Sequence, residues 1–190
     1  MNLRTKILLA CLAIFTVPAH GAQDGCPEGS YAVVVSPDHT TLSILFDRFH
    51  IDSGPAASAE SVSKVCHIVH PLNLPANMSL GVYKINYRGF AKLAPARQAL
   101  LDVQYSLGPK DNEPGRVFRR KVNGSHDGDY FFTENIGAGQ MKRVGCGADA
   151  KLNIRIALAL SGDGEAMASL DSSDGKSAAM VYHLNLKKCN

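Results

Sequence analysis

The stretch Lys151–Leu160, with the sequence KLNIRIALAL, decides the fold class. Aliphatic side chains occupy every second position from Leu152 to Leu160, and the positions between them hold Asn153, Arg155 and two alanines. Because successive side chains of a β-strand point to opposite faces, this run predicts a strand with one face buried. A helix repeats every 3.6 residues and would not place five aliphatic residues at a spacing of two.

Alternating apolar runs of the same kind recur along the chain, separated by Gly, Pro, Asn or Asp. Many short strands between such turns predict an all-β fold, and we expect an antiparallel β-sandwich of the jelly-roll or immunoglobulin-like kind. Within 78–88 the alternation slips once, which predicts a β-bulge near Tyr83–Lys84. The segment Ala91–Gln98 is expected to form at most a short turn of helix. The other expected strands are Tyr31–Ser36, Thr41–Phe49, Val62–Leu74, Leu101–Leu107, a segment around Tyr130–Phe132, Glu165–Leu170 and a last strand over Met180–Leu186.

The first 21 residues have the pattern of a secretory signal peptide. Arg4 and Lys6 precede an apolar run from Ile7 to Val17, and Ala19 and Gly21 fit the small-residue positions before a cleavage site. The run is too short to span a bilayer, which needs roughly 20 residues. We therefore expect a signal peptide over 1–21 and a single secreted domain over 22–190.

An alternative interpretation makes Leu8–Cys11 a lipoprotein cleavage box. Only Ile7–Ala10 would then serve as the apolar region, which is short for an export signal. We prefer the cut after Gly21 and expect a secreted or periplasmic protein.

The charge of the mature chain limits its partners. Arg4 and Lys6 leave with the signal peptide and no acidic residue does, so the formal net charge falls from +3 to +1. A nearly neutral domain argues against nucleic acid as a partner. No later segment is long and apolar enough to predict a transmembrane span.

Four cysteines remain after cleavage, and an even number in an exported chain predicts two disulfides with three possible pairings. If the strand over 151–160 and the last strand are antiparallel neighbours, Cys146 and Cys189 lie at the same end of the sheet. This favours Cys146–Cys189 and leaves Cys26–Cys66. No C-x-x-C spacing is present, so we expect structural cysteines, no metal and no cofactor.

Several segments together resemble a family of secreted bacterial and fungal proteins with four cysteines, catalogued as domain of unknown function 4360. The resemblance covers Cys26 to Cys189 and implies export, the cysteine framework and an all-β fold. It implies no activity and no catalytic residue. The matching segments are Cys26–Ser30, Ser36–Asp38, Thr41–Ile44, Phe46–Phe49, Asn86–Gly89, Cys146–Gly147, Leu152–Ile154 and the C-terminal cysteine.

Two short motifs are candidate ligand-binding sites. In the motif Tyr87–Phe90, Arg88 lies between aromatic residues and could hold an anionic or sugar ligand by charge and stacking. In Phe46–Phe49, together with Asp52, Asp47 and its neighbouring arginine could present a carboxylate and a guanidinium on the solvent face of a strand. The structural alternatives are a core tyrosine at Tyr87 and a surface ion pair at Asp47, and the second is worth less than about 1 kcal/mol.

Other polar residues give weaker signals. His67 and His70 are three apart and should face opposite sides of a strand, so they are poorly placed to share a metal. The basic cluster Arg116–Lys121 fits either an anionic partner or a charged edge strand.

No nucleophile elbow, Walker loop or dinucleotide motif is present. The leading hypothesis is therefore a non-enzymatic binding protein for an extracellular glycan or protein. The alternatives are a secreted inhibitor or effector that presents a stapled loop such as Gly108–Gly115, and an unrecognised hydrolase that uses scattered Asp and His residues.

Overall fold

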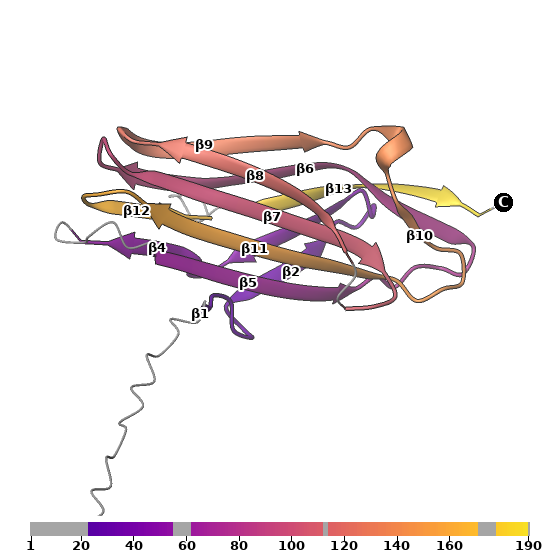
Figure 1. Ribbon diagram of the computed structural model, residues 1–190. Coiled ribbons are helices and arrows are strands. Elements are labelled where there is room, and N and C mark those ends of the chain that lie inside the picture. Colours follow the sequence, from indigo (N-terminus) through magenta and orange to yellow (C-terminus); the bar gives the residue numbers. More distant parts are fainter. Residues whose placement is uncertain (1–22, 55–61, 112–113, 171–177, 190) are drawn as a thin grey trace, which may run out of the picture.

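A computed structural model describes residues 23–54, 62–111, 114–170 and 178–189. In this part of the chain two β-sheets pack face to face, and their strands run along the long axis of the molecule (Figure 1). The all-β prediction and the sandwich are confirmed. One pairing is parallel, between β1 and β5, whereas the other strand pairs are antiparallel.

The smaller sheet has five strands in the order β1-β5-β11-β7-β8. Its central strand is β11, the segment that decides the fold class, and its ten-residue pairing with β5 and longer pairing with β7 hold it on both edges. The strands are β1 (Gln23–Asp24), β5 (Val62–Pro71), β11 (Lys151–Ser161), β7 (Gln98–Gly108) and β8 (Arg116–Asn123).

The larger sheet has eight strands, with β2-β3-β13-β6-β12-β4 as its main path. The long strand β6 is its spine, because β13 and β12 pair with one edge of β6 while β10 and β9 pair with the other. The strands are β2 (Tyr31–Val35), β3 (Thr41–Phe46), β4 (His50–Ser53), β6 (Met78–Leu93), β9 (His126–Asn135), β10 (Arg143–Gly145), β12 (Ala166–Ser169) and β13 (Met180–Lys188), and a 3-10 turn, η1, covers Ala138–Gln140.

The predicted bulge lies where the alternation slips. His183 pairs with Lys84 and the next residue of β13, Leu184, pairs with Val82, so Tyr83 is the extra residue. The expected helical turn over 91–98 is wrong, because β6 continues to Leu93 and β7 begins at Gln98. The tight turn between them leaves no room for a helix.

The core lies between the two sheets. All five alternating aliphatic residues of β11, from Leu152 to Leu160, are at most 3% exposed. Full burial of such a side chain stabilises the fold by about 1.5–3 kcal/mol relative to leaving it in water. The alternating polar positions face outward, so one face of β11 anchors the core and the other is free for a site.

Two disulfides cross-link the sandwich, Cys26–Cys66 and Cys146–Cys189, and these are the pairs expected from the sequence. The geometric reason for the second pair was wrong, because β11 and β13 lie in different sheets. The short strand β10 instead brings Cys146 beside β6. The Cys146 amide donates to Met78 O, and the Cys189 amide donates to Asn77 O.

Candidate functional site

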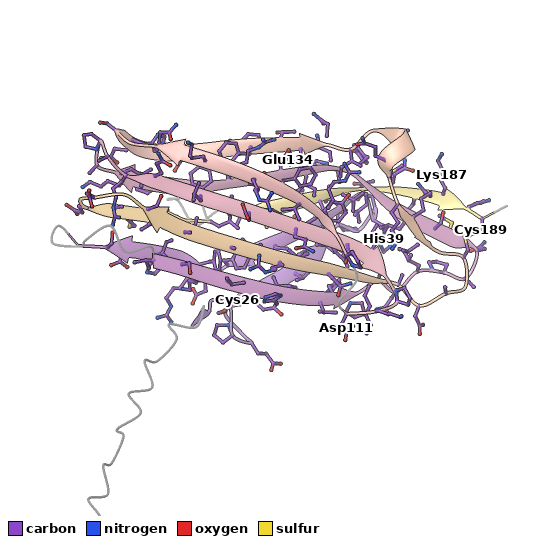
Figure 2. The ribbon with its side chains drawn as sticks, in the orientation of Figure 1. Cys26, His39, Asp111, Glu134, Lys187 and Cys189 are labelled. Atoms are coloured by element: carbon purple, nitrogen blue, oxygen red, sulfur yellow. A yellow bond between two sulfur atoms is a disulfide. The ribbon has the colours of Figure 1, made fainter. Side chains whose placement is uncertain are left out.

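Tyr87, a predicted ligand contact, lies in the core and reaches the hollow beside Arg88 only from within the sheet. Its side chain is 1% exposed, and its hydroxyl donates a hydrogen bond to Glu134 Oε1. The other carboxylate oxygen of Glu134 accepts from Arg120 Nη2 at 2.5 Å, which joins β9 of one sheet to β8 of the other. Burial first, and then Glu134, raises the pKa of Tyr87 far above its ordinary value. Figure 2 labels Glu134 at this edge. The ring is therefore a structural element.

Asp47 lies in the turn between β3 and β4. Its carboxylate pairs with the adjacent Arg48 at 3.3 Å, and the two side chains are 67% and 81% exposed. An exposed pair of this kind contributes less than about 1 kcal/mol. Asp47 does not line the hollow in which Arg88 lies. The structure therefore does not bring these two candidates into one site.

Arg88 faces outward from the larger sheet, one position after the buried Tyr87. It pairs in register with Phe131 of β9, whose ring is 60% exposed, and its backbone amide donates to Ala179 O. A hollow of about 220 Å³ lies here, lined by Arg88, Phe131, Asn86, Val181 and residues beside them. We call it the Arg88 hollow.

The guanidinium of Arg88 is incompletely paired. Its Nε and Nη2 atoms are buried, and in the described part of the chain neither has a hydrogen-bond acceptor. These two atoms form one edge of the planar guanidinium, and two parallel N–H groups on one edge match the two oxygens of a carboxylate or phosphate. A buried donor without an acceptor costs about 1–3 kcal/mol. The hollow therefore holds donors suited to an anion.

The floor beside Arg88 is fixed by a hydrogen-bonded chain. Thr133 Oγ1 donates to Asn86 Oδ1 at 3.1 Å, and Asn86 Nδ2 lies 3.1 Å from His183 Nε2. Burial, and then the charge of Lys84, lowers the pKa of His183, which favours a neutral ring that accepts the amide hydrogen. The polar groups of Asn86 are thus engaged, and the unpaired donors of Arg88 are the distinctive chemistry of this hollow.

The basic cluster is divided by strand alternation. Arg116 donates to Gln140 and Arg120 donates to Glu134, both toward the inside of the sandwich. Arg119 pairs with Asp102 on the outer face. This arrangement agrees with the interpretation of a charged edge strand, β8, rather than with one continuous basic patch.

The two histidines of β5 face opposite sides, as expected. His67 lines a hollow on the outer face of the smaller sheet, and His70 lines an apolar pocket at one end of the sandwich. Within the described residues, no group of three or more His, Cys, Asp or Glu side chains is placed to hold a metal ion. Nor does that part of the chain contain a helix long and apolar enough to cross a membrane.

Comparison with known proteins places this architecture in a family. The family model described as "Domain of unknown function (DUF4360)" matches residues 14–189. The chain belongs to this family. DUF4360 carries no assigned activity in its description, so a function for this chain has to be argued from its own structure.

One curated relative of this DUF4360 protein is described as an "Uncharacterized secreted protein" of Arthroderma benhamiae. It is 24% identical over 168 residues, which cover 87% of this chain and 67% of the relative. No solved structure matches the chain significantly.

Proposed function

We propose that this protein is an extracellular binding protein that recognises the carboxylate of an acidic glycan in the Arg88 hollow. The observation that carries the proposal is the buried Nε–Nη2 edge of Arg88, which has no acceptor in the described chain. Export is supported by the N-terminal signal pattern and by the secreted relative.

The size and lining of the hollow favour a sugar acid over a protein surface. The hollow has a volume of about 220 Å³, which accommodates a single small group. A stable protein interface is a much more extended surface and buries roughly 800 Å² on each partner. The exposed ring of Phe131 offers an apolar face beside the cation, which suits the C–H face of a sugar next to its carboxylate. No carboxylate or histidine is among the described residues that line the hollow, so the site favours binding over acid–base chemistry.

The other hypotheses have less support. The structure describes the loop over 108–115 only up to Asp111 and from Pro114, and in sequence this loop lies outside both disulfide-closed segments, 26–66 and 146–189. Its Lys110 carbonyl and Asp111 carboxylate bond to β11 of the same chain. An inhibitory loop would instead present its polar groups to the partner.

Binding to polygalacturonate, with neutral dextran as the reference polymer, tests the proposal. A hydrogen bond to a charged group contributes about 1.5–3 kcal/mol, so Arg88→Met should weaken binding by about 10-fold to 150-fold. Arg88→Lys keeps the charge and loses the paired edge, and it should recover only part of the affinity. Phe131→Ala should weaken binding as well.

The matched control is Arg119→Met, which removes an arginine from the outer face of the other sheet. Its affinity for polygalacturonate should stay within about twofold of the wild type, because exposed charges contribute little. Equal losses from Arg119→Met and Arg88→Met would show that general charge attraction binds the polymer. That result, or equal binding of dextran and polygalacturonate, would contradict a carboxylate site at Arg88.

A further inference from the structure

A second hollow, of about 320 Å³, lies on the outer face of the smaller sheet, on the opposite side of the sandwich from Arg88. The hollow is lined by two rows of side chains that are neighbours across paired strands, and each row has one residue on β5, one on β11 and one on β7. The first row is Val69, Asn153 and Ser106, and the second is His67, Arg155 and Gln104. We call it the β11 groove.

The first residues of the loop after β7, up to Asp111, border the groove and are bonded to β11. Asn153 Nδ2 donates to Lys110 O at 2.9 Å, and Lys151 Nζ lies 2.6 Å from Asp111 Oδ1. Asp111, labelled in Figure 2, and Pro114 complete the lining from this loop. The groove is therefore a built concavity with a fixed wall rather than a gap between mobile side chains.

Asn153 indicates which kind of ligand the groove could bind. It is 8% exposed although it lies on the outer face of the sheet, and its Oδ1 is buried with no hydrogen-bond donor in the described chain. The bond from Nδ2 to Lys110 O fixes which edge of the amide faces the loop, so Oδ1 is left as an unpaired acceptor. A buried acceptor of this kind costs about 1–3 kcal/mol.

A ligand that donates a hydrogen bond would satisfy this unpaired acceptor. A carboxylate has no hydrogen to give to Asn153 Oδ1, whereas a sugar hydroxyl can donate to it and accept from Arg155 or Gln104 at the same time. Val69 adds an apolar surface, 44% exposed, for the C–H face of the ring. The volume lies at the lower end of small-molecule sites, which span roughly 300–1,000 Å³.

We infer that the β11 groove binds a neutral, hydroxyl-rich ligand, a sugar residue of an extracellular glycan, through Asn153, Arg155 and Gln104. This site is independent of the Arg88 hollow for two reasons. Asn153 Oδ1 needs a ligand that donates a hydrogen bond, whereas Arg88 needs one that accepts, and the two sites lie on different sheets. A protein with both sites could hold an acidic and a neutral glycan segment on opposite faces.

An array of neutral oligosaccharides built from hexoses and N-acetylhexosamines tests the inference, followed by calorimetric titration of any glycan that binds. Asn153→Leu keeps the side-chain volume and removes the acceptor, and it should weaken binding by at least tenfold. If that variant fails to fold, Arg155→Met decides the question, because Arg155 is only half-buried and its loss leaves the loop contact intact.

Two controls separate this inference from the proposal for Arg88. Arg119→Met lies on the same sheet face outside the groove and should leave the neutral glycan bound as before. Arg88→Met should leave it unchanged too. Failure of every neutral oligosaccharide to bind would overturn the inference, as would unchanged affinity in the folded Asn153→Leu or Arg155→Met variant. Either result can occur while polygalacturonate binding at Arg88 persists.

Discussion

Replacing Arg88 by methionine should stabilise the unliganded protein. The guanidinium has two buried donors, Nε and Nη2, with no acceptor in the described chain, and each carries a desolvation cost of about 1–3 kcal/mol. Methionine keeps most of the apolar stem and removes both donors. Because part of the Arg88 side chain still reaches solvent, we expect a net gain of about 1–3 kcal/mol in the free energy of unfolding. For a domain of this size the melting temperature should rise by roughly 2–12 °C.

The assay is equilibrium unfolding in urea at pH 7.5, followed by circular dichroism, with Arg143→Met as the matched control. Arg143 is also half-buried and belongs to the same sheet, but each of its three guanidinium nitrogens is hydrogen-bonded. It donates to the hydroxyl and carbonyl of Ser79 and to the side chain and carbonyl of Asn185, at 2.8–3.2 Å. Its loss should cost about 1–3 kcal/mol, the opposite sign to Arg88→Met.

The two substitutions should change the free energy of unfolding in opposite directions, and this makes the reasoning refutable. An arginine retained for folding destabilises when it is removed, whereas one retained for a ligand stabilises the free protein and weakens binding. If Arg88→Met loses 1 kcal/mol or more, as Arg143→Met should, then the guanidinium has a partner in the folded chain. The carboxylate site would then have no basis.

Three further measurements test the fold. Alanine at both Cys146 and Cys189 opens a loop with a separation of 43 residues and should cost about 4 kcal/mol in the chain-entropy model, measured by urea unfolding. Hydrogen bonds within the first hairpin, the largest from a serine hydroxyl, lower the pKa of Asp38 to about 2, so its carboxyl resonance should titrate near that pH in an NMR experiment. Burial lowers the pKa values of His70 and His183 below the ordinary 6.5, so the unfolded chain binds more protons as the pH falls through 6.5. Stability should therefore fall between pH 7.5 and 5.5, and glutamine at both positions should reduce that loss.

The strands that alternate cleanly could be predicted from sequence because burial dictates their pattern. In β11 five aliphatic side chains face the core, and in β6 the slip in parity marks the bulge at Tyr83. Which strands belong to which sheet could not be predicted from the sequence in the same way. The expectation that β11 and β13 are neighbours was wrong because each strand carries information about which face is buried and none about which edge it pairs with.

Part of the candidate site could be predicted from the sequence. The alternation that buries Ile85 also buries Tyr87 and turns Arg88 outward, so the sequence already separates the two residues. Phe131 could not be assigned as the partner of Arg88, since their pairing depends on the register between β6 and β9. The β11 groove could not be predicted from the sequence for the same reason. Asn153 was predicted to face outward, but its burial depends on a loop that follows a different strand.

The unpaired groups are tolerable in this fold because the chain is cross-linked. Arg97 Nε and Tyr182 Oη are also buried without a partner in the described chain. The Arg88 edge and the Asn153 acceptor alone cost about 2–6 kcal/mol, which is comparable to the roughly 4 kcal/mol that each disulfide contributes. A domain with a total stability of about 5–15 kcal/mol would otherwise lose much of its margin to them. Because a carboxylate ligand would satisfy the Arg88 edge, its stabilising effect should be proportionally largest when a disulfide is removed. A ligand that raises the melting temperature of the Cys146→Ala/Cys189→Ala variant, and fails to do so once Arg88 is methionine, would show that binding at Arg88 offsets part of the lost cross-link.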